Sequence, residues 1–256
     1  MEYFYRVPTT YLENDYKEIM IRFCLDSKSN LEHQTSVSVG SICTRCGYSA
    51  NNRDSNKGSF STYIRQTLAW MVKDGEIRQT YGDDVSSVRL NNLVEFQLLD
   101  KFYESQPTTI FCKLTQNVFD TIIGMDSKYS SLTLLKLYTY IRSHIVESTR
   151  TAYGFNKSIE IAHIETGVSR KTFDECLALF VEHGLFIKHI TGGCYIRNQP
   201  RTMPNIYVLP DNNATENIKT ILDEMKRRYA VDEFLPQIGN NFKKNADLSN
   251  KGYANE

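Results

Sequence analysis

The sequence contains no apolar run that approaches the roughly 20 residues needed to span a bilayer. Its first residues, from Met1 to Arg6, also lack the basic and then apolar regions of a secretory signal. We therefore expect a cytoplasmic protein with no membrane partner. In that compartment the six cysteines would be reduced thiols and not disulfides.

An excess of either charge is missing as well. The chain of 256 residues has 30 Lys and Arg against 30 Asp and Glu, so its formal net charge is zero. Proteins that bind nucleic acid usually carry a basic excess, because neutralising phosphates releases counterions and drives association. The balance counts against tight non-specific binding, but it does not exclude a local basic face.

Motifs of catalysis and cofactor binding are absent too. The sequence has no phosphate loop, no Gly-x-Gly-x-x-Gly turn and no Gly-x-Ser-x-Gly elbow. Cys43 and Cys46 have the spacing of half a zinc site or a redox pair, but no second close pair of cysteines or histidines accompanies them. We expect no enzymatic activity, no cofactor and no metal.

A second set of possible zinc ligands could converge from a helix and a hairpin. It consists of Cys176, His183, His189 and Cys194. Cys176 falls on the apolar face of its helix, as free cysteines often do, and His183 precedes a helix-ending glycine, where a cation suits the helix dipole. A structural role is therefore the better interpretation of both residues.

What the sequence does contain is one pattern that occurs twice, about 110 residues apart. Each copy is an amphipathic helix, a glycine stop and a strand, preceded by a short helix and a tight turn at Gly47 or Gly167. The first copy has Leu68, Met71, Val72, Gly75 and Ile77, and the second has Leu177, Phe180, Val181, Gly184 and Phe186. This order predicts an α+β fold, mainly α with small β-wings, made of tandem winged helix-turn-helix domains.

The first domain is predicted to span residues 1–95 and the second 116–210, with a connector over 96–115. In the first we expect helices over 15–26, 41–46 and 59–74, a strand over 35–39 and a hairpin of 76–80 with 85–90. In the second we expect helices over 116–123, 132–146, 158–166 and 170–183, a wing of 185–190 with 194–196, and a strand over 205–209. Residues 211–238 should hold a C-terminal helix, centred on 214–228, and 239–256 a disordered tail.

The third helix of each domain is the predicted DNA-reading element. On the first, Ser59, Thr62, Gln66 and Lys73 share a side without acids, which suits a major groove, where Gln66 could read an adenine edge. The second shows two acids, so DNA contact would depend on the helix start and the wing. The predicted DNA-binding residues are Ser59, Thr62, Gln66, Lys73, Ser169, Arg170, Lys171, Thr172, Lys188 and Arg197. The alternatives are a solvated helix face in the first copy and a protein–protein surface in the second.

Trp70 lies far from the centre of the apolar side of its helix. A half-exposed tryptophan there would pack against another element or act as an anchor of an interface.

Several stretches have a more specific likeness. They are LLKLYTYI at 134–141, TGVSRKT at 166–172, EHGLF at 182–186, PNIYVL at 204–209 and YRVP at 5–8. In these stretches the chain resembles winged-helix replication-initiation proteins of bacterial plasmids, phages and other mobile elements. The resemblance implies that the turn serine and the residues after it, Ser169 to Thr172, approach DNA.

Together these features predict a non-enzymatic protein that binds double-stranded DNA in replication initiation of a plasmid, phage or integrative element. Two recognition helices on one chain could read two half-sites, as a symmetric dimer does. A transcriptional regulator is the first alternative. An adaptor that uses winged helices to bind proteins in a replication or partition complex is the second. Besides DNA, the expected partners are a second copy of the chain or replication proteins.

Overall fold

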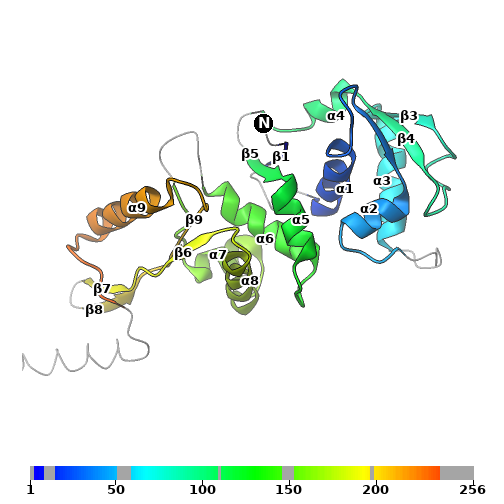
Figure 1. The fold of residues 1–256 in the computed structure, drawn as a ribbon. Coiled ribbons are helices and arrows are strands. Elements are labelled where there is room, and N and C mark those ends of the chain that lie inside the picture. The colour runs from blue at the N-terminus through cyan, green and yellow to red at the C-terminus, as the bar shows by residue number, and fades with distance from the viewer. Residues whose placement is uncertain are drawn as a thin grey trace, which may run out of the picture. The chain divides into compact units, whose positions relative to one another are not determined.

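The computed structural model describes residues 3–8, 15–50, 59–108, 111–145, 153–196 and 199–236 (Figure 1). Helices and small antiparallel sheets alternate along them, which confirms the α+β class. The chain divides into two compact units, Met1–Tyr140 and Ile141–Glu256. No helix in the described ranges is long and apolar enough to cross a membrane.

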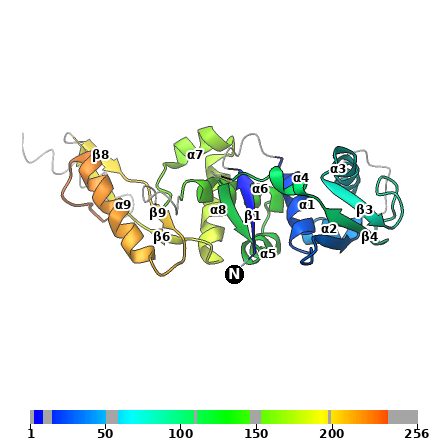
Figure 2. The ribbon, with the colours of Figure 1, turned by 90° about the horizontal axis from the view of Figure 1, so that it is seen from above.

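The first unit contains a three-stranded antiparallel sheet with the order β2-β4-β3. Its elements follow one another as helix, strand, helix, helix, strand and strand. They are α1 (Tyr16–Asp26), β2 (Gln34–Val37), α2 (Val39–Arg45), α3 (Phe60–Asp74), β3 (Ile77–Tyr81) and β4 (Val94–Leu98). Figure 2 shows α3 beside β3 and β4. Phe23, Ile64, Leu68 and Phe96 are almost fully buried in the core between helices and sheet.

Local signals in the sequence explain where these helices begin and end. Asp15 caps α1 by accepting a hydrogen bond from the Lys17 amide at 2.9 Å. Ser38 and Ser41 form a reciprocal capping box at the start of α2. Gly75 ends α3 with a φ of 76°, a left-handed conformation that glycine adopts without a steric penalty.

The hairpin predicted after α3 is partly wrong. β3 does form, but its partner is β4 and not residues 85–90, which contain no strand. Val85, Val88 and Leu90 belong instead to the loop that joins β3 and β4, and their apolar side chains are buried. The predicted first domain ends at residue 95, which lies inside β4. The domain boundaries stay predictions.

The second unit repeats this arrangement with shorter strands. After α6 (Ser131–Ser143), which contains the boundary between the units, come α7 (Ile159–Thr166), α8 (Arg170–Glu182), β6 (Ile187–His189) and β9 (Ile206–Val208). β9 pairs with β6, and its Tyr207 also forms an isolated bridge with Phe155. The order Phe155, β9, β6 therefore corresponds to β2, β4, β3 in the first unit.

The wing predicted for the second copy is wrong in its pairing. β7 (Gly193–Ile196) pairs with β8 (Gln199–Thr202) and not with β6. The Met203 amide donates to the Gly192 carbonyl at 2.9 Å, so the β6–β9 and β7–β8 ladders continue each other in one long ribbon. Residues 191–193, which the sequence predicts as the turn of this wing, lie within one strand of the ribbon and do not reverse the chain.

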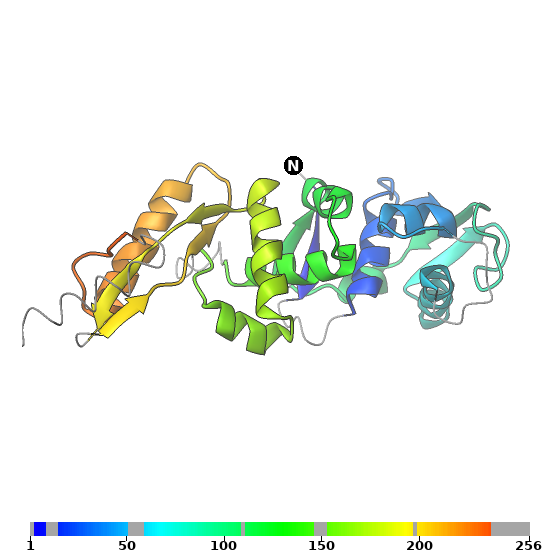
Figure 3. The same cartoon turned by 90° about the horizontal axis from the view of Figure 1, so that it is seen from below.

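Helix α9 (Ala214–Tyr229) packs along this ribbon, as Figures 1 and 3 show. Met203, Ile206 and Val208 of the ribbon form one apolar cluster with Ile221 and Met225 of the helix. The chain then returns to the ribbon, where Leu235 and Gly193 exchange two backbone hydrogen bonds. The helix predicted over 214–228 is confirmed; the tail over 239–256 lies outside the described residues.

Three elements lie between the two copies. They are α4 (Asp100–Glu104), β5 (Phe111–Thr115) and α5 (Gln116–Gly124), of which only α5 is predicted from the sequence. β5 pairs antiparallel with β1 (Phe4–Pro8), so the predicted connector contributes a strand to the first unit.

The β1–β5 pairing is symmetric about Arg6 and Lys113, which lie directly opposite each other. Phe4 and Phe111 occupy equivalent places two residues earlier on each strand and stack with their ring planes 8° apart. Arg6 lies over the Phe111 ring and Lys113 over the Phe4 ring, at 5.1 and 5.3 Å. Each copy of the repeat is thus preceded by a strand, and these two strands pair with each other.

Candidate nucleic-acid interface

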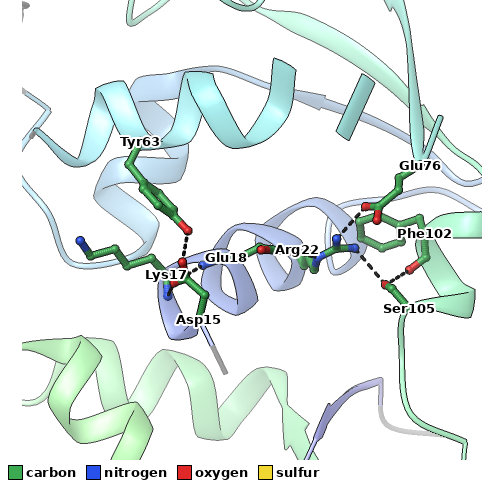
Figure 4. Close-up of polar contacts among 8 residues, drawn as sticks. All are labelled: Asp15, Lys17, Glu18, Arg22, Tyr63, Glu76, Phe102 and Ser105. Carbon is green, nitrogen blue, oxygen red and sulfur yellow. Dashed lines mark hydrogen bonds and ion pairs between the residues drawn. The ribbon is translucent and has the colours of Figure 1, made fainter. Parts of the chain in front are cut away.

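The start of α3 is fixed to the start of α1 (Figure 4). The Tyr63 hydroxyl of α3 donates to the Asp15 carboxylate, and the Lys17 ammonium lies 5.3 Å from the centre of the Tyr63 ring. Burial and the neighbouring Asp15 raise the pKa of Tyr63, so the hydroxyl stays protonated and remains a donor.

The end of α3 is fixed by a buried arginine of α1. Arg22 contacts Glu18 and Glu76 at 2.7 Å each and donates to the Ser105 hydroxyl at 3.0 Å (Figure 4). Its guanidinium also lies 5.3 Å from the Phe102 ring centre. Glu76 directly follows the glycine that ends α3, so this network sets the position at which the helix gives way to β3. Burial raises the pKa of Glu76, and Arg22 opposes that rise.

The remaining side of α3 is open to solvent. Gln66 and Lys73 are exposed there, and Thr62 is partly exposed. Ser59 caps the helix, accepting from the Thr62 amide at 3.2 Å, and its hydroxyl lies 2.9 Å from that of Thr62. The structure therefore brings these four predicted residues onto one helix, but the Ser59 hydroxyl is already engaged in capping.

A pocket of about 490 Å³ lies between this side of α3 and the loop from β3 to β4. Ser86 and Ser87 of the loop face Thr62, Gln66 and Ala69 across it, and no carboxylate is among the described residues that line it. This is an acid-free recess beside the predicted reading face.

Arg65 holds the loop in place. This α3 residue is 9% exposed, and its Nε donates to the Val88 carbonyl at 3.0 Å. Sequence reasoning missed Arg65, Ser86 and Ser87, because the loop resembled a strand. A buried arginine on the apolar side of α3 was the one signal that could have indicated the tether.

Trp70 is 48% exposed on the flank of α3. This agrees with the half-exposed position expected from the helical projection.

Helix α8 ends and begins as α3 does. Ser169 caps it through the Thr172 amide at 3.1 Å, as Ser59 does for Thr62. After each helix the residue that follows the glycine donates its amide to a carbonyl five residues earlier. The Glu76 amide bonds to the Met71 carbonyl at 2.9 Å, and the Leu185 amide bonds to the Phe180 carbonyl at 2.8 Å. The two predicted reading helices are thus built by one local design.

The outward residues of α8 differ from those of α3. Arg170 and Lys171 are 61% and 82% exposed, but Arg170 lies 3.5 Å from Glu160 and Lys171 lies 3.9 Å from Glu175. Lys188 is exposed on β6, and Arg197 lies outside the described residues. The cations at the start of α8 therefore share their surface with carboxylates.

The cysteines serve as packing residues in this fold. Cys43 and Cys46 are buried, and the Cys46 sulfur lies 3.6 Å from that of Cys24 on α1. Burial raises the pKa of Cys43 and of Cys194. Within the described ranges no three His, Cys, Asp or Glu side chains come together in a way that could hold a metal ion.

Comparison of the chain with known protein families, with curated proteins and with solved structures finds no match. Function is therefore inferred from the residues and their arrangement.

Proposed function

We propose that this chain binds double-stranded DNA through two winged helix-turn-helix domains. The element order of the first unit and its sheet order β2-β4-β3 support this assignment, as does their repetition in the second unit. In such domains the helix at the place of α3 or α8 enters the major groove. The loop between β3 and β4 takes the place of the first wing, and the ribbon from β6 to β9 that of the second.

The observation that carries the proposal is the acid-free outward side of α3. An exposed amide (Gln66) and an exposed ammonium (Lys73) lie on a helix fixed at both ends, beside an acid-free recess. Amide side chains pair with adenine edges, and ammonium groups bind phosphates. Because α8 places carboxylates beside its cations, we assign the main DNA contact to the first unit.

Fluorescence anisotropy with a labelled random duplex tests this proposal across a range of salt concentrations. Lys73→Ala should weaken binding to every sequence and reduce the slope of log K against log salt by about one. Lys219→Ala on α9, also an exposed cation, is the matched control and should change neither. Absence of any salt-dependent binding by the unaltered chain at low ionic strength would sink the proposal.

Base reading by Gln66 is tested separately. Once a preferred site has been selected from random DNA, Gln66→Ala should weaken binding to it by about 1–3 kcal/mol and leave binding to random duplex unchanged. Equal losses on both DNAs would mean that Gln66 does not read bases.

We further propose that the DNA bound is a replication origin of a plasmid, phage or integrative element. Support comes from the resemblance of residues 134–141, 166–172, 182–186 and 204–209 to initiators of such elements. The chain, supplied in trans, should allow a plasmid carrying the DNA beside its gene to replicate. If it instead changes only the expression of a reporter driven by that DNA, the chain is a transcriptional regulator.

A further inference from the structure

The short helices α2 and α7 occupy the same place in the two copies. Ser38 caps α2 through the Ser41 amide at 3.1 Å, and Ser158 caps α7 through the Ile161 amide at 3.3 Å. Ser41 and Ile161 therefore occupy the same helical position, three residues after the cap. Three residues further on, the equivalent pair is Thr44 and Ile164.

The outward sides of these helices differ in polarity. The first copy has two hydroxyl side chains, Ser41 and Thr44, whereas the second has two isoleucines. Ile161 is 45% exposed and Ile164 is 77% exposed. Because the first copy keeps the same fold with polar residues there, the two isoleucines are not needed to form the helix. Ile161 and Ile164 lie three residues apart on the helix, so they form one small exposed apolar patch.

A pocket of about 660 Å³ borders the outward side of α2. Its lining is largely apolar, with Val37, Ile42 and Leu93 among the contributors. Lys28 and Arg45 also line it, and the described lining residues include no carboxylate. The Nε of Arg45 is buried and has no hydrogen-bond partner there. The rest of the Arg45 guanidinium is engaged, since Nη2 donates to Gln116 at 2.8 Å and lies 3.9 Å from Asp120. The pocket thus presents apolar surface together with the exposed ammonium of Lys28.

We propose that α7 of one molecule docks into the α2 pocket of a second copy of this chain. Ile161 and Ile164 would supply apolar surface, and the neighbouring Glu160 would face the exposed ammonium of Lys28. Glu160 is free to change partners, because its contact with Arg170 is 3.5 Å long and both side chains are more than half exposed.

The contact joins two different surfaces, so it is head-to-tail. In a pair of molecules, one keeps an empty α2 pocket and the other keeps an unbound α7. It does not involve Gln66 or Lys73 of α3, so it stands independently of the proposed DNA binding.

Analytical ultracentrifugation of the full chain over a range of concentrations tests the association. Ile164→Thr introduces the residue that the first copy has at this position and should weaken self-association about tenfold or more. Leu31→Thr is the matched control: Leu31 is fully exposed and does not line the pocket, so association should be unchanged. Far-UV circular dichroism checks that each variant is folded. A chain that stays monomeric at every concentration, or equal effects of the two variants, would overturn the proposal.

Cross-linking tests which surfaces meet. Thr44→Cys and Ile164→Cys proteins, mixed under mild oxidation, should form a mixed disulfide dimer. The six native cysteines are buried and should contribute little background. A yield no higher than that of Thr44→Cys mixed with Leu31→Cys would contradict this contact. A chain carrying both Thr44→Cys and Ile164→Cys that closes on itself at high dilution would show that the occupant is its own α7.

Discussion

Replacement of Arg22 by Met should destabilise the first unit severely. Methionine retains the apolar part of the side chain, so packing against Phe102 changes little, but the guanidinium is lost. Glu76 then keeps a carboxylate in a site where its side chain is only 5% exposed, without its partner at 2.7 Å. Removal of one member of a buried ion pair costs about 3–5 kcal/mol.

Most of that loss comes from Glu76. The pair with Glu18 is partly open to solvent, and since the Glu18 side chain is 31% exposed it contributes about 0.3–0.5 kcal/mol. With a denaturant slope of about 2 kcal/mol/M, the urea midpoint should fall by about 1.5–2.5 M. The further change Glu76→Gln removes the stranded charge and should recover much of the loss.

The loss should depend on pH with a definite sign. Burial already raises the pKa of Glu76, and Arg22 opposes the rise, so the variant should have a still higher pKa in the folded state. Between the unfolded and the folded pKa the folded state binds more protons, and stability therefore falls as pH rises through that window. The deficit of Arg22→Met should be larger at pH 7 than near pH 5.

Trp70 makes the measurement specific. It is the single tryptophan of the chain and lies on α3, so its fluorescence during urea unfolding reports the first unit. An unchanged midpoint for Arg22→Met, a pH-independent deficit, or no recovery with Glu76→Gln would each refute the reasoning.

Two further predictions use the same reporter. Ser59→Ala and Ser169→Ala should each cost about 1 kcal/mol through loss of a helix cap, but only Ser59→Ala should lower the midpoint seen by Trp70; equal shifts would contradict two separately folding units. Gly154→Ala should destabilise the second unit by about 1–3 kcal/mol, because its new methyl would lie 2.7 Å from Ile221 Cδ1 and 2.8 Å from the Tyr207 carbonyl. Circular dichroism should then show an early transition while the Trp70 curve stays in place, and a single unshifted transition would refute the predicted clash.

The helices are the part of the fold that the sequence predicts well. Their apolar periodicity and their caps, such as Asp15, Ser59 and Ser169, are local signals within one turn of the chain. Strand partners are not local. Residues 85–90 follow a turn and are predicted as the second strand of a hairpin, yet they bury their apolar side chains in a loop, while β4 takes the place beside β3.

The candidate site follows the same division. Helical projection places Gln66 and Lys73 on the outside of α3, since a rigid helix fixes their direction. Arg65 is also on that helix, but its role depends on the Val88 carbonyl of a distant loop. The carboxylates beside Arg170 and Lys171 include Glu160 of another helix, which projection of α8 alone does not reveal.

The symmetric pairing of β1 with β5 has a consequence for how such a chain could arise. A protein with only one copy of the repeat would leave the edge of its entry strand without a partner. Because the pairing is centred on Arg6 and Lys113, the same strand of a second molecule could fill that edge with the same hydrogen bonds. When two such protomers are fused into one chain, the pairing of the two strands no longer depends on protein concentration. Each half can then change its outer surface independently of the other, and the outward residues of α3 and α8 do differ.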